Sequence, residues 1–116
     1  MAKTKIDAVT FSGASGRQYE FRVYVWGTKF KSVPGVYVVV SRTMEPGANP
    51  RYESVFVGSA SDLSKAFENH PRGDCFQMYY ANVVGVLKEP DAGAREKISA
   101  DLIKGLAPPC NADDAE

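Results

Sequence analysis

Val36-Tyr37-Val38-Val39-Val40-Ser41 is a nearly unbroken apolar segment near the middle of the chain. β-Branched residues dominate it, and a strand built from it would be apolar on both faces. Such strands are typical of the interior of a sheet, where other elements cover both faces. The segment therefore predicts a central β-strand, and we interpret the rest of the chain by how it can pair with this strand or pack on it.

Further strands are expected on both sides of this segment. Residues 54–57 are its predicted antiparallel neighbour, because residues 44–50 (MEPGANP) are rich in turn-forming residues. Earlier in the chain, residues 19–26 alternate between two faces with the period of a strand. Residues 6–11 are the expected partner of that strand, across a glycine-containing turn at residues 12–16. The N-terminal part is therefore predicted to be a β-hairpin.

The C-terminal half predicts helices around one more strand. Residues 62–69 have apolar side chains at helical spacing, with Ser61 as the expected N-cap. A short helical piece at residues 74–78 and a strand at residues 81–87 follow. A last helix is expected over residues 94–106, before two prolines end it. The predicted fold class is α+β, a small antiparallel β-sheet flanked by helices with an N-terminal β-hairpin extension.

A length of 116 residues and 44% hydrophobic residues fit a single globular domain over residues 1–116. We divide it into the hairpin extension (1–32), a core (33–111) and an acidic tail (112–116) that we expect to be frayed. The longest apolar segment is much shorter than a membrane span, and no apolar stretch follows the N-terminus. We therefore expect no membrane association and a cytoplasmic location.

The cysteine count and the charge narrow the function classes. Cys75 and Cys110 show no metal-binding spacing and are too few for a disulfide framework, so we expect free thiols. Fourteen basic residues balance fourteen acidic ones, which argues against strong sequence-independent DNA binding. A local basic face stays possible, although scattered solubilising charge is the favoured interpretation; its candidate cations are Lys29, Lys31, Arg42, Arg51, Lys65, Arg72 and Lys104.

Four short motifs in a fixed order carry a resemblance to a known family. They are Gly35-Val36-Tyr37, Phe56-Val57-Gly58, Asp62-Leu63, and Leu102-Ile103 followed by Pro108-Pro109-Cys110-Asn111. Together they resemble the GIY-YIG nuclease superfamily, in particular its small single-domain bacterial members, from about Val33 to Asn111. The resemblance implies the same α+β architecture.

The resemblance also implies a chemistry that this chain has largely lost. Family members cut a phosphodiester bond with one divalent metal, two tyrosines, an arginine and a glutamate. At the matching positions Tyr37 is retained, whereas the second tyrosine is replaced by Phe56, the arginine by Ala66 and the glutamate by Ser99. A methyl group cannot stabilise a phosphate, and a neutral hydroxyl cannot anchor Mg²⁺ alone. The family's catalytic positions therefore predict a domain that is not an active enzyme.

Other residues near these positions are candidate binding groups. Lys65 is adjacent to Ala66 but displaced by about 100° around a helix, and Arg95 lies four residues before Ser99. Glu96 is the only local carboxylate that we expect to reach a metal, if one binds. His70 is favoured as a packed or helix-terminal histidine over a base or ligand; Asn111 matches a family asparagine that we expect to tie down the chain end.

Three hypotheses follow. The first is a non-catalytic GIY-YIG-like domain without a cofactor, which binds nucleic acid weakly or a protein partner. The second is an active nuclease with relocated groups, in which Glu96 holds Mg²⁺ or Mn²⁺ and Lys65 or Arg95 meets the phosphate. In the third, the N-terminal hairpin is the functional part and forms a homodimer or partner contact through Tyr24 and Trp26, although internal packing is favoured for these two side chains.

Overall fold

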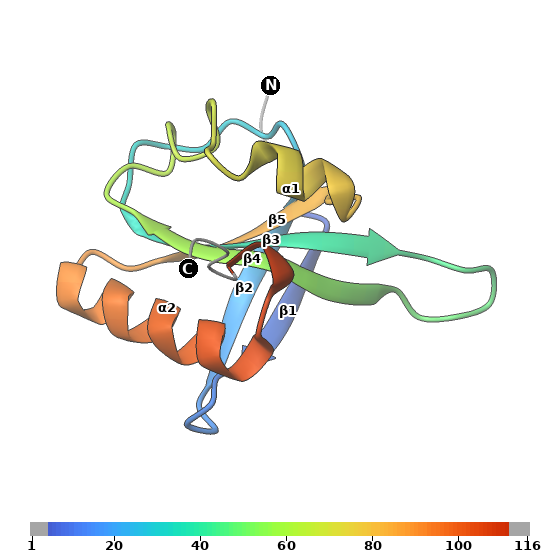
Figure 1. Cartoon of the computed structure of the whole chain (residues 1–116), viewed down its shortest axis with the longest axis horizontal. Helices are drawn as coiled ribbons and strands as arrows, with labels where there is room; N and C mark the ends of the chain where they lie inside the picture. The colour runs from blue at the N-terminus through green and yellow to red at the C-terminus, as the bar shows by residue number, and fades with distance from the viewer. Residues whose placement is uncertain (1–4, 112–116) are drawn as a thin grey trace.

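Residues 5–111 are described by a computed structural model of the chain, and the predicted acidic tail at residues 112–116 lies outside them. The described chain forms five strands, two α-helices and one 3₁₀ helix (Figure 1). The elements, in chain order, are β1 (Asp7–Ser12), β2 (Gln18–Val25), β3 (Gly35–Thr43), β4 (Arg51–Ala60), α1 (Gly73–Met78), β5 (Val83–Lys88), α2 (Ala92–Leu106) and η1 (Pro109–Asn111). None of these helices has the length and apolar character needed to cross a bilayer.

All five strands belong to one antiparallel sheet with the order β1-β2-β5-β3-β4. β5 comes last in the sequence, yet it lies between the N-terminal hairpin and the β3–β4 hairpin. The predicted α+β class with an antiparallel sheet is therefore confirmed, and the hairpin extends the same sheet. As predicted, β3 is an interior strand, and its residues from Gly35 to Ser41 are all buried.

The sheet separates two hydrophobic clusters, because alternate residues of β3 point to opposite faces. Val36, Val38 and Val40 join the first cluster, to which α2 contributes Leu102. Tyr37 and Val39 join the second cluster, which is covered by α1 and by the chain around residues 61–82. Figure 1 shows α1 and α2 on opposite sides of the sheet.

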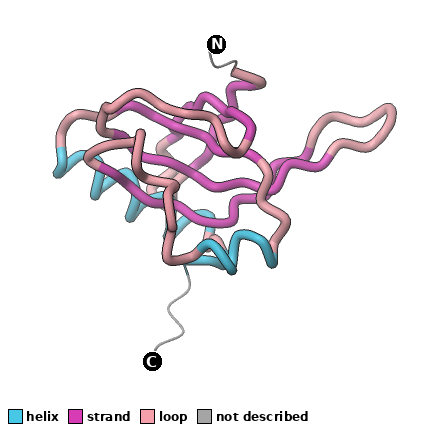
Figure 2. The backbone as a smooth tube through the Cα atoms, turned by 90° about the horizontal axis from the view of Figure 1, so that it is seen from above, coloured by secondary structure: helices cyan, strands magenta, loops and turns pink. Residues whose placement is uncertain are grey.

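The sheet is strongly curled, so its two outer strands approach each other at one end. The Tyr52 hydroxyl of β4 donates a hydrogen bond to the Asp7 carboxylate of β1, and Arg42 Nε donates to the same hydroxyl at 3.0 Å. Beyond this contact the β3–β4 hairpin continues away from the body of the domain, as Figure 2 shows.

The predicted helix over residues 62–69 is wrong, because this segment forms consecutive tight turns. Its backbone bonds join residues three apart, from the Lys65 N–H to the Asp62 carbonyl and from the Ala66 N–H to the Leu63 carbonyl. The Asp62 carboxylate accepts a bond from the Ser64 N–H at 2.9 Å. Asp62, rather than the predicted Ser61, therefore organises the local backbone. An aspartate carboxylate that accepts a hydrogen bond from a nearby backbone N–H can favour a turn over a helix.

The other predicted elements are confirmed, with boundaries moved by a few residues. α1 covers the expected helical piece, and α2 begins two residues earlier than predicted, at an N-cap where the Asp91 carboxylate accepts from the Ala94 N–H. Internal packing of the hairpin aromatics is confirmed for Tyr24, which is 7% exposed. Trp26 makes edge-to-face contacts with Phe67 and Phe76 but keeps 41% of its surface exposed.

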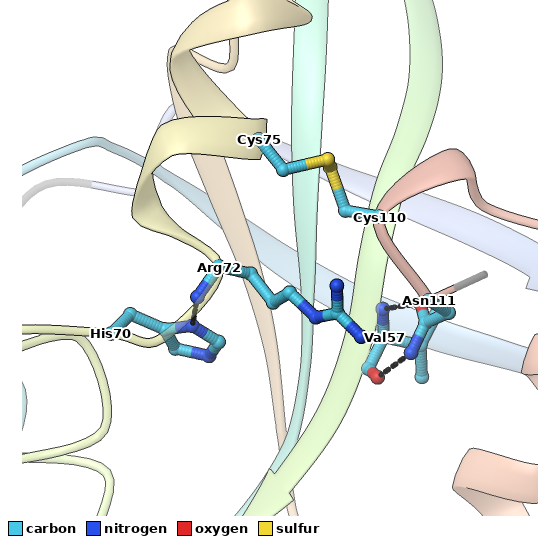
Figure 3. Close-up of a disulfide and its surroundings, with 6 residues drawn as sticks. All are labelled: Val57, His70, Arg72, Cys75, Cys110 and Asn111. Carbon is cyan, nitrogen blue, oxygen red and sulfur yellow. Dashed lines mark hydrogen bonds between the residues drawn. A yellow bond between two sulfur atoms is a disulfide. The ribbon is translucent and has the colours of Figure 1, made fainter. Parts of the chain in front are cut away.

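The prediction of two free thiols is wrong, because Cys75 of α1 and Cys110 of η1 form a disulfide (Figure 3). After α2 the chain passes the outer edge of β4 and reaches the second cluster, where Cys110 is buried. The two cysteines are 35 residues apart, and their spacing carries no sign of this pairing. Only the path of the chain around β4 brings them together.

Candidate functional site

The ring of Tyr37 lies in the second cluster, and a glycine on the next strand makes room for it. Gly58 of β4 is directly opposite Tyr37 in the sheet register. A Cβ at position 58 would lie 2.6 Å from the Tyr37 hydroxyl oxygen and 2.9 Å from a ring carbon of Phe56. The second glycine of the motifs is thus required by the packing of the tyrosine. With 5% of its surface exposed, Tyr37 is nearly inaccessible to solvent.

The Tyr37 hydroxyl is hydrogen-bonded to His70, with 2.9 Å between Oη and Nε2. His70 Nδ1 accepts a bond from the Arg72 backbone N–H at 3.0 Å. We assign the ring proton from these bonds: Nδ1 is an acceptor, so the neutral imidazole carries its proton on Nε2 and donates it to the tyrosine. The backbone of the 70–72 turn therefore orients the imidazole toward Tyr37.

Both members of this pair are neutral at physiological pH. Burial raises the pKa of Tyr37 to about 12. Burial, together with the positive charge of Arg72, lowers the pKa of His70 below its ordinary value. A low-polarity environment disfavours the phenolate and the imidazolium alike. The pair is therefore a neutral hydrogen bond and not an ion pair.

Aromatic rings fill the space around the pair. The ring of Phe67 lies 4.9 Å from that of Tyr37, measured between centroids, while Phe56 and Phe76 lie 5.0 and 4.8 Å from the His70 ring. Such contacts stabilise a core through burial and edge-to-face packing. They also keep water from the tyrosine hydroxyl, which a general acid or base would have to meet.

Three of the four catalytic positions implied by the motifs come together, and the fourth does not join them. Phe56 and Ala66 pack against the cluster that contains Tyr37. Ser99 lies on α2, whose apolar side chains belong to the cluster on the other sheet face. Its hydroxyl is buried without a hydrogen-bond partner in the described part of the chain.

Asn111 has the structural role that the sequence predicts. Its side-chain carbonyl accepts from the Val57 N–H at 2.7 Å, and its amide donates to the Val57 carbonyl at 2.9 Å (Figure 3). Both bonds go to an outer strand of the sheet, whose backbone would otherwise be unpaired there. Asn82 binds the backbone of Arg42 on β3 in the same way, at 2.8 Å for each bond.

The remaining candidate residues are dispersed. Lys65 and Glu96 are exposed, on the turn segment and on α2. Arg95 Nη1 donates to the backbone carbonyls of Glu89 and Pro90 at 3.1 and 2.9 Å, so its guanidinium is used in the loop before α2. Across residues 5–111, no three His, Cys, Asp or Glu side chains gather in a group that could hold a metal ion.

Sequence reasoning missed Arg72 as part of this site. Its backbone orients His70, and Figure 3 shows its side chain pointing toward Val57 and Asn111. In the sequence Arg72 is one of several scattered cations, and the proline before it marks only a turn. A helix over residues 62–69 would have placed His70 at a helix end, whereas the actual turns carry it back over Tyr37.

No protein-family model matches the chain, and no curated protein or solved structure matches it either. The relation to GIY-YIG nucleases therefore stays a prediction from the four motifs.

The stability of the fold is expected to depend on the protonation of His70, the only histidine in the chain. Because its pKa is lowered in the folded state, the unfolded chain takes up a proton first as the pH falls below about 6.5. The free energy of unfolding should therefore decrease from pH 7.5 to pH 5.5. Urea unfolding across this range measures the effect.

The matched control for this experiment is His70→Gln, which cannot titrate. Asp7, Asp62 and Asp101 also have lowered pKa values, but the stability that they contribute is lost only near pH 4 and below. An equal pH slope in the wild type and in His70→Gln would contradict the assignment of a neutral buried imidazole.

Proposed function

We propose that this chain is a GIY-YIG-like domain without catalytic activity that binds nucleic acid or a protein partner. The observation that carries the proposal is the state of Tyr37, whose hydroxyl is buried and bonded to His70. A nuclease of this kind needs a hydroxyl that meets the attacking water beside the scissile phosphate. A phenol with a pKa of about 12 beneath aromatic rings suits a structural role.

The substitutions at the other motif positions support the same conclusion. Phe56 has no hydroxyl, and the ring that remains packs against His70. Ala66 supplies no charge to stabilise a phosphate, and Ser99 supplies no carboxylate. The residues that build the core are retained, while those needed only for transfer chemistry are absent.

A nuclease assay tests the proposal. The purified chain is incubated with plasmid and branched DNA in the presence of Mg²⁺ or Mn²⁺, and we expect no cleavage above a mock preparation. Binding to the same DNA is followed by gel shift without metal. Cleavage by the wild type that disappears in Tyr37→Phe would contradict the proposal, because this variant removes only the hydroxyl.

Mg²⁺ or Mn²⁺ is needed only in an active version of the domain, with Glu96 as the metal ligand and Lys65 or Arg95 at the phosphate. The exposed position of Glu96 allows a direct test by calorimetric titration with Mn²⁺. Binding that is lost in Glu96→Gln would favour the active version. Absence of binding, or equal binding by both proteins, would exclude it.

The outer position of β1 favours a second candidate function, self-association through the N-terminal hairpin. An outer strand offers unpaired backbone groups to another chain, and the nearby side chains of Ile6 and Val25 are 38% and 53% exposed. Light scattering at several protein concentrations tests this candidate, and a monomer mass throughout would exclude it.

We further propose the cytoplasmic location that the sequence favours. The Cys75–Cys110 disulfide argues against this location, because disulfides persist in oxidising compartments and are mostly transient or catalytic in the cytosol. Thiol labelling of the protein in intact cells would decide whether the bond is closed there.

A further inference from the structure

One cavity lies beside the N-terminal hairpin, and neither Tyr37 nor His70 lines it. Its volume is about 570 Å³, within the usual range for sites that bind small molecules. The hairpin and β5 form one side of it, and the chain at residues 30–33 with Leu63 forms the other. Tyr37, Phe56 and His70 do not line it.

Cations dominate the charged groups that line this cavity. The lining contains four cations and one carboxylate. The cations are Arg22 of β2, Lys31 of the following loop, Lys88 of β5 and Lys5, and the carboxylate is Glu20. The only ion pair among residues 5–111 joins Arg51 to Glu53, so none of these four cations is neutralised by a salt bridge within the described chain. In a chain with zero net charge, this local excess creates an electropositive hollow.

The floor of the cavity is apolar. Tyr24, Leu63 and Val86 line it, and all three belong to the second hydrophobic cluster. Arg22 and Val86 are directly paired across β2 and β5, so a cation stands immediately beside apolar surface. A free phosphate ion would use only the cations, whereas a ligand with both an anionic group and a flat apolar body would use the whole cavity.

We infer that this cavity binds a nucleotide unit, with Arg22, Lys31 and Lys88 around the phosphate and the base on the apolar floor. A guanidinium offers paired donors that match phosphate oxygens, and lysines add charge. Flat bases pack well on aromatic and aliphatic surface. The inference extends the proposed binding role without depending on it, because Arg22 and Lys31 precede the region that resembles GIY-YIG nucleases. The unit is either a free nucleotide or part of a single strand.

Calorimetry and amide NMR at low salt test this inference on the full chain. The probes are adenosine 5′-monophosphate, adenosine, inorganic phosphate and an eight-residue oligodeoxyadenylate without terminal phosphates. We expect the monophosphate to bind more tightly than either adenosine or phosphate and to shift the amide signals of residues 20–24 and 86–88. Tighter binding of the oligonucleotide would identify a single strand as the source of the unit, and tighter binding of the monophosphate a free nucleotide.

Charge variants locate the site. Arg22→Gln with Lys88→Gln should weaken binding of the preferred probe by about tenfold or more, while Lys97→Gln on exposed α2 should change it by less than about twofold. These exposed substitutions are expected to leave folding intact. The inference is overturned if neither nucleotide probe binds, if the double variant binds as the wild type does, or if phosphate alone binds as tightly as the monophosphate. These outcomes do not depend on whether the chain has nuclease activity.

Discussion

Loss of the Cys75–Cys110 disulfide is expected to lower the free energy of unfolding by about 4 kcal/mol, the largest single effect that we predict. The bond joins residues 35 apart. Cross-linking a loop of that length lowers the entropy of the unfolded chain and so raises its free energy by about this amount. The bond also fixes η1 against α1. The chain between these two elements passes the outer edge of β4. Urea unfolding with and without a reductant measures the difference.

The double variant Cys75→Ser with Cys110→Ser is the matched control, because its stability should not respond to the reductant. Reduced wild type and double variant should unfold at similar urea concentrations. Hydrogen exchange should increase first around η1 and at the Val57 N–H, which bonds to Asn111. Equal urea midpoints for oxidised and reduced wild type would contradict the prediction.

The substitution Gly58→Ala is expected to destabilise the domain by about 2 to 3 kcal/mol, the cost of forcing an extra methyl group into a packed core. The new Cβ would lie 2.6 Å from Tyr37 Oη and 2.7 Å from the adjoining ring carbon. The ring cannot easily move, because Phe67 packs against it and His70 is bonded to its hydroxyl. Chemical denaturation of the variant measures the loss.

Two further proteins show whether the steric contact is the cause. Gly73→Ala is the matched control, because a Cβ there meets nothing within 4 Å, and it should be neutral or slightly stabilising. In a Tyr37→Phe background the closest contact of the new methyl group is gone, so Gly58→Ala should cost less than in the wild type. An equal cost in both backgrounds would show that the hydroxyl contact does not matter.

Packing contacts explain why the motifs contain glycine and tyrosine at these positions. Gly58 leaves room for Tyr37, and a Cβ on Gly35 would lie 2.6 Å from the Leu87 carbonyl oxygen of β5. The motif residues therefore allow close contact between neighbouring elements of this sheet. A chain without catalytic activity would need the same glycines in order to fold.

Strands were easier to predict from the sequence than the segment that carries His70. The alternation in residues 19–26 and the continuous apolar residues of β3 depend on local periodicity, and the structure confirms both. Residues 62–69 have helical periodicity, but Asp62 bonds to the backbone of Ser64 and starts a series of turns. Periodicity indicates which side chains are buried. It does not show whether a local side-chain hydrogen bond is more favourable than a helical backbone hydrogen bond.

The amino-acid sequence by itself determined the α+β class and the interior position of β3, because both depend on hydrophobic period. The role of Asn111 was expected from the motif resemblance alone. Only the tertiary structure decided three contacts. Cys75 is bonded to Cys110, His70 is hydrogen-bonded to the buried Tyr37, and Arg22 and Lys88 line one cavity. These contacts join residues dozens of positions apart. They depend on the path of the chain around the sheet, which no local pattern contains.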